Sequence, residues 1–263
     1  MGEKQERILA FYFTNTGGMR PNNEDGLLVQ EILISDRSME SPGTLEIPFA
    51  DTFFCVADGI GGEQRGEIAS RMVLRSLRDH ASAITDEPSL LNALKEAKSD
   101  LDRYGTDHPE SFNLGCTMSG VILRGPQIIT FNIGDCRVYR LNGKFFQRVT
   151  KDHSIVQSLF EDGVITEEDM RHHPKRNIVT SSISGDGKPD SVEVFSTILN
   201  RREKETLFLC SDGVWGCFAH EELEMIYEKF HGIEFCEKLL TASLARRVSD
   251  NISVIILNIF PAE

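Results

Sequence analysis

Residues 116 to 149 constrain the fold most, because four apolar runs follow one another there with only tight turns between them. The runs are Cys116–Leu123, Ile128–Ile133, Arg137–Leu141 and Lys144–Val149. The turns are Gly125-Pro126, Gly134-Asp135 and Asn142-Gly143, and the last of these is a strong signal for a two-residue hairpin. Strands joined in this way pair antiparallel, so this block cannot be a series of strand–helix–strand crossovers.

The remaining apolar patterns predict more strands and several helices. Further strands are predicted at Ile8–Phe13, Leu27–Ile34, Thr52–Ala57, Leu207–Cys210 and Ile252–Ile259. Apolar residues at helical spacing predict helices at Ile68–Leu77, Leu90–Leu101, Ser154–Phe160, Glu221–Phe230 and Phe235–Arg246. We expect Gly105 to stop the second of these helices. The first and last strands are strongly apolar, and we expect them to be central.

Helix pairs that lie between strand blocks favour one architecture. Two mainly antiparallel sheets packed face to face, with a helix pair outside each sheet, would bury every apolar face. We therefore predict an α+β fold, a four-layer α-β-β-α sandwich. No repeat, low-complexity segment or linker interrupts the chain, so residues 1–263 are expected to form a single domain. Residues 35–51 are expected to form an inserted loop, and residues 165–190 are polar and irregular.

Charge and cysteine usage narrow the classes of partner. The formal net charge is −13, so the average surface repels nucleic acid and anionic lipid. The six cysteines show no metal-ligand spacing and lie mostly in apolar runs; they are Cys55, Cys116, Cys136, Cys210, Cys217 and Cys236. No apolar run is long enough to span a membrane. We expect a soluble, cytoplasmic protein that binds neither nucleic acid nor membrane.

Acidic residues recur at the ends of the predicted strands. The four sites are Asn23-Glu24-Asp25, Asp58-Gly59, Asp212-Gly213 and Asp250-Asn251. Each of them alone is typical of an ordinary turn. If the strand ends lie together, however, three or four carboxylates converge, and a divalent cation is the natural way to relieve their repulsion. Oxygen-only ligands favour Mg²⁺ or Mn²⁺ over zinc.

Eight motifs in order along the chain resemble those of the PP2C-type (PPM) protein phosphatases, most closely the bacterial type. They are Arg20-Pro21-Asn22-Asn23-Glu24-Asp25, Val56-Ala57-Asp58-Gly59-Ile60-Gly61-Gly62, Leu114-Gly115-Cys116-Thr117, Asn132-Ile133-Gly134-Asp135-Cys136-Arg137-Val138-Tyr139, Thr150-Lys151-Asp152-His153-Ser154 followed by Gly163-Val164-Ile165, Asn177-Ile178-Val179-Thr180, Ser211-Asp212-Gly213-Val214-Trp215, and Ser249-Asp250-Asn251-Ile252-Ser253-Val254. Cys136 replaces a serine of the family pattern.

The resemblance implies a metal centre of two or three Mn²⁺ or Mg²⁺ ions at one end of the sandwich. Its implied ligands are Glu24, Asp25, Asp58, Gly59, Asp135, Asp212 and Asp250. By analogy, Asp58 bridges two metals and Asp135 serves a third together with Asp212. Arg20 would grip the substrate phosphate, so Arg20, Asp58 and Asp212 are the implied catalytic residues. Residues 165–190 correspond to the flap of the family, which lies beside the active site.

The implied activity is hydrolysis of phosphoserine and phosphothreonine in proteins by a metal-activated water. The substrates would be targets of a serine/threonine kinase, and we expect a monomer. One departure concerns Ile60, because some members carry a histidine there that protonates the leaving alkoxide. Another is that Arg246-Arg247-Val248 stands where the family has glycine shortly before Asp250, which puts the turn that carries Asp250 in question.

Other interpretations were weighed on the same residues. No arginine lies six positions after a cysteine and there is no G-x-x-x-x-G-K-[ST] loop, so a cysteine phosphatase and a P-loop nucleotidase are excluded. A catalytically weak binding module and a phosphatase of a small phosphorylated molecule stay open as alternatives. His153 is expected to form a structural hydrogen bond and His172-His173 to be solvated, rather than to bind zinc. Arg137 is expected to form an ion pair that supports the Asp135 loop, and Trp215 to be a core anchor.

Overall fold

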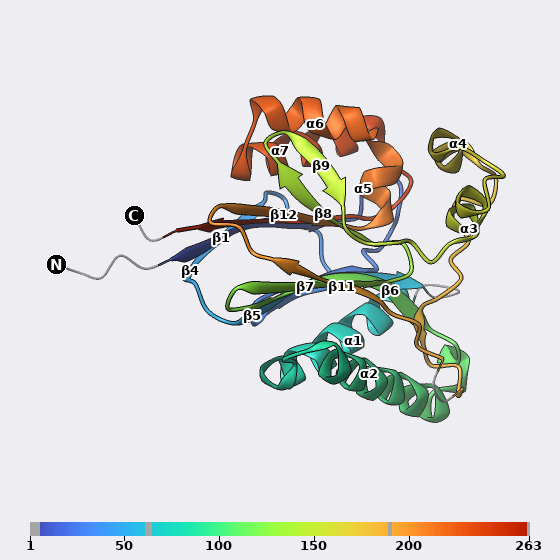
Figure 1. Ribbon diagram of the computed structural model, residues 1–263. Helices are drawn as coiled ribbons and strands as arrows, with labels where there is room; N and C mark the ends of the chain where they lie inside the picture. Colours follow the sequence, from blue (N-terminus) through green and yellow to red (C-terminus); the bar gives the residue numbers. More distant parts are fainter. Residues whose placement is uncertain (1–5, 61–64, 189–190, 262–263) are drawn as a thin grey trace.

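The computed structural model describes residues 6–60, 65–188 and 191–261. Two antiparallel sheets pack face to face, and helices cover the outer face of each (Figure 1). The predicted four-layer α-β-β-α sandwich is therefore confirmed. In the part of the chain that the structure describes, none of the helices is both long and apolar enough to cross a membrane.

The first sheet contains both ends of the described chain in its interior. Its strand order is β4-β1-β13-β12-β8-β9. The strands are β1 (Arg7–Asn15), β4 (Gly43–Pro48), β8 (Arg137–Asn142), β9 (Phe145–Arg148), β12 (Glu205–Cys210) and β13 (Ile252–Phe260). β1 pairs with β13 along its whole length, from Arg7 opposite Phe260 to Asn15 opposite Ile252. The expectation that the first and last strands are central is confirmed.

The strands of the second sheet all lie between residues 25 and 200. Its order is β11-β7-β6-β5-β2-β3, with β10 also paired to β6. The strands are β2 (Asp25–Val29), β3 (Ile32–Ile34), β5 (Thr52–Ile60), β6 (Gly115–Arg124), β7 (Gln127–Ile133), β10 (Ile183–Ser184) and β11 (Phe195–Asn200). The hairpin predicted at Asn142-Gly143 joins β8 to β9 in the other sheet, with Gly143 at a φ of 60°.

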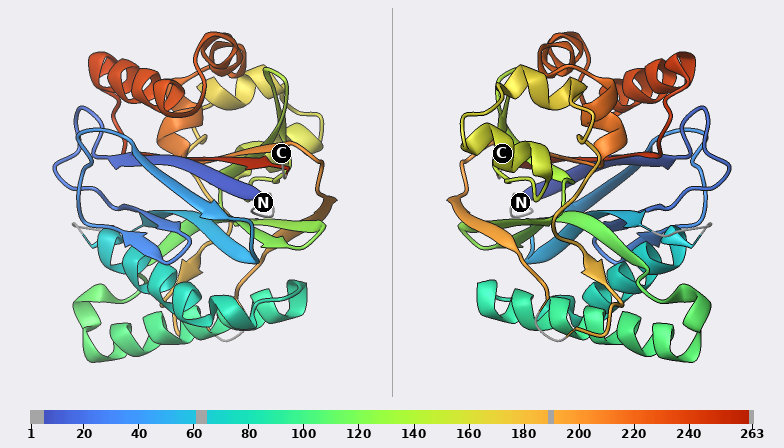
Figure 2. Two further views of the ribbon diagram at one scale, coloured as in Figure 1. Left: turned by 90° about the vertical axis from the view of Figure 1, so that its left-hand side faces the viewer. Right: turned by 90° about the vertical axis from the view of Figure 1, so that its right-hand side faces the viewer.

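The helices form two outer layers and one separate group. α1 (Gly66–His80) and α2 (Glu87–Asp107) cover the second sheet, while α5 (Asp212–Cys217), α6 (His220–Lys229) and α7 (Gly232–Arg246) cover the first. α3 (Ile155–Glu161) and α4 (Glu167–His172) lie at one end of the sandwich, next to α5 (Figure 2). This end is opposite the two termini (Figure 1).

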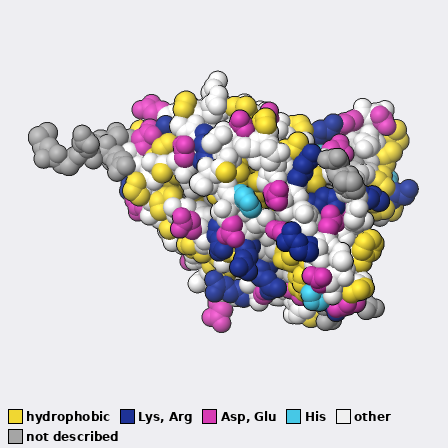
Figure 3. All heavy atoms as spheres, turned by 90° about the horizontal axis from the view of Figure 1, so that it is seen from below, with side chains coloured by type: hydrophobic (Ala, Val, Ile, Leu, Met, Phe, Trp, Pro, Cys, Tyr) yellow, Lys and Arg dark blue, Asp and Glu magenta, His cyan; other side chains and the backbone are white. Residues whose placement is uncertain are grey.

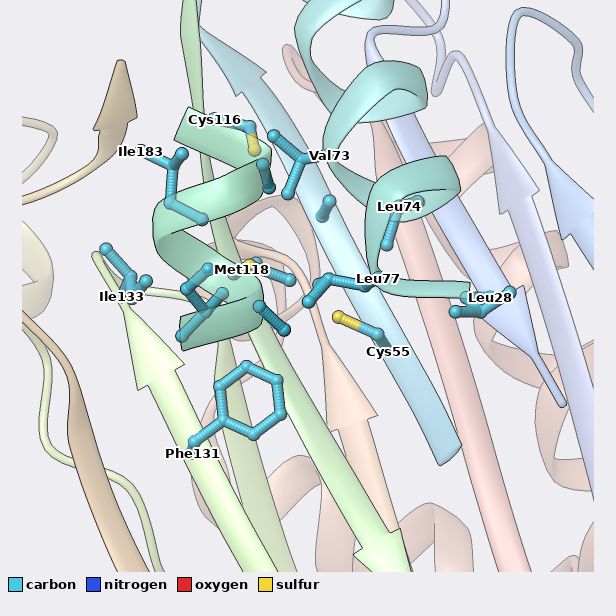
Figure 4. Close-up of a cluster of buried hydrophobic side chains, with 14 of the residues drawn as sticks. Leu28, Cys55, Val73, Leu74, Leu77, Cys116, Met118, Phe131, Ile133 and Ile183 are labelled. Atoms are coloured by element: carbon cyan, nitrogen blue, oxygen red, sulfur yellow. The ribbon is translucent and has the colours of Figure 1, made fainter. Parts of the chain in front are cut away.

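Three layers of apolar side chains hold the sandwich together. One lies between the two sheets, one under α5 to α7, and one between the second sheet and α1–α2. In the last of these, Val73, Leu74 and Leu77 of α1 point towards Cys55 and Met118 on the sheet (Figure 4). The outer face on the α1–α2 side carries Lys and Arg interspersed with Asp and Glu, as expected of a solvated helix layer (Figure 3).

Several local predictions were wrong, each because tertiary contacts or a single backbone angle decided the outcome. α2 does not stop at Gly105 but runs on to Asp107, since one glycine costs a helix only about 1 kcal/mol. The run Leu27–Ile34 is a hairpin of β2 and β3, because Gln30 takes a positive φ of 59°. The expected loop at 35–51 contains β4, an edge strand paired to β1. β11 and the short helices α4 and α5 were not predicted.

The turn before Asp250 forms without glycine. α7 ends with Arg247 in the left-handed region, at φ 52° and ψ 55°, a conformation that costs a non-glycine residue about 1–2 kcal/mol. The backbone at Gly18 packs closely against this turn, which is feasible only because Gly18 has no Cβ. A Cβ at Gly18 would lie 2.4 Å from the Arg247 Cα. The turn therefore forms without the glycine of the family pattern, at the cost of strain in its backbone.

We predict that Arg247→Gly raises the free energy of unfolding by about 0.5–1 kcal/mol, because the relief of the left-handed backbone outweighs the added freedom of the unfolded chain. Ala245→Gly is the matched control: Ala245 is also exposed, but it lies within α7, so glycine there should destabilise by about 1 kcal/mol. Chemical denaturation measures both changes. A loss of stability in both variants would contradict the strain at Arg247.

Candidate metal centre

Two of the predicted carboxylates face each other across neighbouring strands of the second sheet. Asp25 at the start of β2 is directly opposite Asp58 near the end of β5, so their side chains lie on the same face of the sheet. Asp58 is in turn opposite Thr117 on β6. Asp25 is fully buried and Asp58 is half-buried. The strand register alone therefore brings two acidic motifs, 33 positions apart in the sequence, together.

The first sheet supplies two more carboxylates at the same end. Asp212 begins α5 directly after β12, and Asp250 lies just before β13, the strand that pairs with β12. A hydrogen bond joins the two sheets here, because the Ser211 hydroxyl donates to Asp25 Oδ2 at 2.8 Å. The Ser211 backbone N–H also donates to the Ser253 carbonyl at 3.1 Å. The predicted convergence of strand ends from both sheets is thus observed.

Glycines let the backbone approach closely around this cluster. A Cβ on Gly59 would lie 2.2 Å from the carbonyl oxygen of Gly66, at the first turn of α1. A Cβ on Gly213 would lie 2.0 Å from the carbonyl oxygen of Asn251. Both Asp-Gly pairs therefore need glycine for packing. The two later glycines of the same motif, Gly61 and Gly62, lie outside the described residues.

Glu24 is held in place from three elements. Its backbone N–H donates to Asn251 Oδ1 at 2.8 Å, and its carbonyl accepts from the Gly59 N–H at 3.1 Å and from Ser70 Oγ at 2.7 Å. Its carboxylate accepts from the Gly66 N–H at 3.3 Å. The sequence did not single out Asn251 or Ser211 as supports, although both stand beside a predicted aspartate in its motif.

Asp135 lies in the β7–β8 turn, and three side chains fix that turn. The Trp215 indole N–H donates to the Asp135 carbonyl at 2.9 Å, and the Gly134 N–H donates to His153 Nδ1 at 3.1 Å. Arg137 forms a bidentate ion pair with Asp152, at 2.6 Å for the closest contact, and stacks 3.7 Å from the Trp215 ring. The structural roles expected for His153, Arg137 and Trp215 are confirmed.

The five aspartates repel one another strongly. Burial first, and then the charges of Asp212 and Asp250, raise the pKa of Asp25 to about 7, against hydrogen bonds from Ser253 and Ser211 that lower it. Burial and the charge of Asp250 raise the pKa of Asp212 to about 6. Burial also holds the pKa values of Asp58 and Asp135 well above their ordinary range, with neighbouring aspartates adding to the effect. The charged forms therefore need a partner.

Two buried carboxylate oxygens indicate that a divalent metal ion fits this cluster. Asp25 Oδ1 and Asp212 Oδ1 are buried without a hydrogen-bond partner among the described residues. Buried oxygens of this kind, surrounded by further carboxylates, suit a hard divalent cation. As the described side chains lie, no three His, Cys, Asp or Glu residues are arranged around one point as a ready metal site. Side-chain rotation can change ligand geometry but cannot remove buried charge, so the unpartnered oxygens still fit a divalent cation.

Arg20 lies at the rim of the cluster. Its Nη2 is 2.9 Å from Asp250 Oδ1, and its Nε donates to the Ser249 carbonyl at 3.0 Å. The side chain is 45% exposed, so the guanidinium is oriented by two anchors yet open to solvent. Of the histidine pair predicted to be solvated, His172 is exposed on α4, whereas His173 is half-buried and its Nδ1 accepts the Lys175 N–H at 3.1 Å.

Comparisons with known proteins agree with this geometry. The family described as Protein phosphatase 2C matches residues 48–250. Serine/threonine phosphatase stp of Listeria innocua is 28% identical over 256 residues, covering 94% of each chain. The structure of serine/threonine phosphatase Stp1 from Staphylococcus aureus is 28% identical, with a TM-score of 0.76, and covers 94% of this chain and 93% of that one.

A further solved structure is similar in fold. It is the catalytic domain of the serine/threonine protein phosphatase PstP in complex with two manganese ions, 23% identical with a TM-score of 0.77 over 97% of this chain and 99% of that one. The family match spans well over half of the chain and includes the positions of Asp58, Asp135, Asp212 and Asp250. The chain therefore belongs to the protein phosphatase 2C family.

Proposed function

We propose that this chain hydrolyses phosphoserine and phosphothreonine in proteins at a centre of two or three Mn²⁺ or Mg²⁺ ions. The observation that carries the proposal is the convergence of carboxylates from both sheets, with the Oδ1 atoms of Asp25 and Asp212 buried and without a partner in the described part of the chain. A phosphatase family member with this cluster intact has the groups that its chemistry requires. The same observation argues against a binding module, which would not need to bury unpaired charge.

In this proposal the metal ligands come from both sheets. The residues that would hold metal are Glu24, Asp25, Asp58, Gly59 through its carbonyl, Asp135, Asp212 and Asp250. Asp58 would lie among the other ligands, because the charges of Asp25, Asp212, Asp135 and Asp250 all act on it. When bound, divalent ions supply a water of lowered pKa and stabilise charge on the phosphoryl oxygens.

Arg20 is proposed to hold the substrate phosphate. Asp250 and the Ser249 carbonyl engage two of its nitrogens, which leaves Nη1 and the exposed edge of the guanidinium for phosphate oxygens. Ile60, 39% exposed at the end of β5, has no proton to give to the leaving alkoxide. Nδ1 of His153 accepts the Gly134 N–H, so this ring nitrogen has no proton to give either.

The proposed substrates are proteins phosphorylated by a serine/threonine kinase, and we propose that the chain acts as a monomer in the cytoplasm. Residues 165–190 are proposed to be the flap of a single domain that spans residues 1–263. Turnover of a phosphothreonine peptide with Mn²⁺, compared with turnover of small phosphorylated metabolites, tests the substrate class. Activity confined to the metabolites would overturn the proposal.

We predict that EDTA abolishes turnover, that Mn²⁺ restores it, and that the fold survives in between. A carboxyl group with a raised folded-state pKa binds its proton more tightly in the folded protein. The pKa of Asp25 rises from 3.8 to about 7 and that of Asp212 to about 6, so the metal-stripped protein should gain stability as the pH falls from 8 towards 5. Mn²⁺ should raise the melting temperature more at pH 8 than at pH 5.5. If the melting temperature of the metal-stripped protein instead fell as the pH was lowered from 8 to 5, the raised pKa values of Asp25 and Asp212 would be contradicted.

We predict that Asp58→Asn and Asp212→Asn each lower kcat by about 100-fold or more, since even groups that merely orient metal ligands are worth about 10–100-fold. The metal-stripped variants should melt at a higher temperature than the stripped wild type, because a buried charge has been removed. Asp107→Asn, at the exposed end of α2, is the control and should change neither quantity. Near-normal turnover of Asp58→Asn at saturating Mn²⁺ would show that the ligand assignment is wrong.

We predict that Arg20→Ala raises KM for a phosphopeptide about tenfold or more, with a smaller fall in kcat, since a charge-assisted hydrogen bond is worth about 1.5–3 kcal/mol. Arg20→Lys should recover only part of the loss. Mn²⁺ affinity should change less than about fivefold, because the exposed pair with Asp250 is worth about 0–1 kcal/mol. Arg103→Ala, exposed on α2, is the control. Unchanged KM and kcat in Arg20→Ala would place Arg20 outside the site.

A further inference from the structure

A pocket lies beside the residues that hold the Asp135 turn, between the flap helices and the helices of the first sheet. Its volume is about 810 Å³, within the range of ligand-binding pockets. The elements around it are β8, β9, α3, α4, α5 and α6, so the flap helices close one side and the helices of the first sheet close the other. Arg137 and Trp215 form part of its wall, and Trp215 also bonds the Asp135 carbonyl. The wall of this pocket is therefore in direct contact with the turn that carries Asp135.

The pocket combines arginines with an apolar wall. Three guanidinium groups line it, those of Arg137, Arg148 and Arg171. The apolar and aromatic part of the lining includes Tyr139, Phe146, Val156, Met170, Trp215 and Phe218. An anionic group held by guanidinium forks, with its aliphatic stem against aromatic rings, matches this lining.

The charge inside the pocket is not balanced. Arg137 and Arg148 share a single carboxylate, that of Asp152, at 2.6 and 3.3 Å. Arg171 forms no ion pair among the described residues, and its Nε is buried without a hydrogen-bond partner there. The acidic residues of the lining, Glu168 and Glu221, are exposed, so water screens their charge. In a chain of net charge −13, this is a local cationic site.

Arg171 is placed to act across the pocket. It lies on α4, in the flap, and its charge reaches α5 and α6. Burial raises the pKa of Cys217 and the hydrogen bond from Arg246 lowers the pKa of Glu222, and at both groups the charge of Arg171 makes a smaller, lowering contribution. Glu222 is already paired with Arg246, so it does not neutralise Arg171. The free guanidinium therefore faces the first-sheet helices from the flap side.

We propose that this pocket binds acidic residues of the phosphoprotein substrate, two to four positions from the phosphorylated residue. The inference rests on the proposed function and extends it to the substrate class. An extended peptide advances about 3.3 Å per residue, so side chains a few positions away pass the Trp215 wall while the phosphate is at the metal centre. The pocket is much larger than a free phosphate ion, and its aromatic walls suit the stems of Glu side chains.

The test compares phosphothreonine peptides of one length that differ only in charge. Two peptides carry Glu at positions two to four, on the N-terminal or the C-terminal side, and the reference peptide carries Gln at all of these positions. Wild type should hydrolyse one Glu peptide with a kcat/KM at least about fivefold above that of the Gln peptide, mainly through KM, and the advantage should shrink with salt. Equal rates on all three peptides would overturn the proposal.

Variants of Arg171 assign the effect to the pocket. Arg171→Ala should remove the advantage of the Glu peptide and leave the Gln peptide and p-nitrophenyl phosphate unchanged, while Arg171→Lys should keep most of it. Arg176→Ala, an exposed arginine of the same segment that does not line the pocket, is the matched control. Loss of turnover on all substrates in Arg171→Ala would make Arg171 part of the catalytic machinery and overturn the proposal.

A binding measurement keeps the test independent of turnover. A fluorescent Glu peptide without phosphate should bind wild type in anisotropy titrations and bind Arg171→Ala at least about fivefold more weakly. If wild type turned over no phosphopeptide, the proposed function would fail, and this titration would still decide the pocket. Equal affinity for wild type and Arg171→Ala would overturn the assignment.

Discussion

The repulsion between carboxylates at one end of the sandwich is the constraint on which the rest of the structure depends. Asp25 and Asp58 face each other on one sheet, and Asp212 and Asp250 approach from the other. Such a cluster persists only where the surrounding fold over-determines it. The fold is stabilised by the three apolar layers and by the pairing of β1 with β13, and the clustered carboxylates are not part of these contacts. In the proposed centre, bound divalent cations would offset the repulsion between these charges.

The sequence predicts the acidic strand ends, because a carboxylate after a buried strand and before a glycine is a local pattern. It also predicts the layers, since the apolar periods of strands and helices are local as well. It does not predict that Ser211 reaches Asp25, because that contact depends on how two sheets are stacked. The lack of glycine around Arg247 put the turn before Asp250 in question. Only the packing against Gly18 and the backbone at the end of α7 show that this turn forms.

The Asp135 turn connects two functions through one set of contacts. Trp215 donates a hydrogen bond to the turn and also lines the arginine-containing pocket, and Arg137 stacks on its ring. Asp152 anchors both Arg137 and Arg148. A ligand that pulls on these arginines therefore acts on the same side chains that position Asp135. In the proposed function, substrate charge would therefore act on the position of Asp135 through direct contacts, with no change in the sheets.

The pairing of β1 with β13 has a consequence for synthesis of the chain. The first sheet cannot close until its last strand has been made, because β13 lies between β1 and β12. Asp250 precedes that strand, so it joins the aspartates of the second sheet only after β13 has been translated. Contacts so distant in sequence slow folding. A nascent chain that ends before β13 should therefore have no phosphatase activity, and activity should appear only once that strand has paired with β1 and β12.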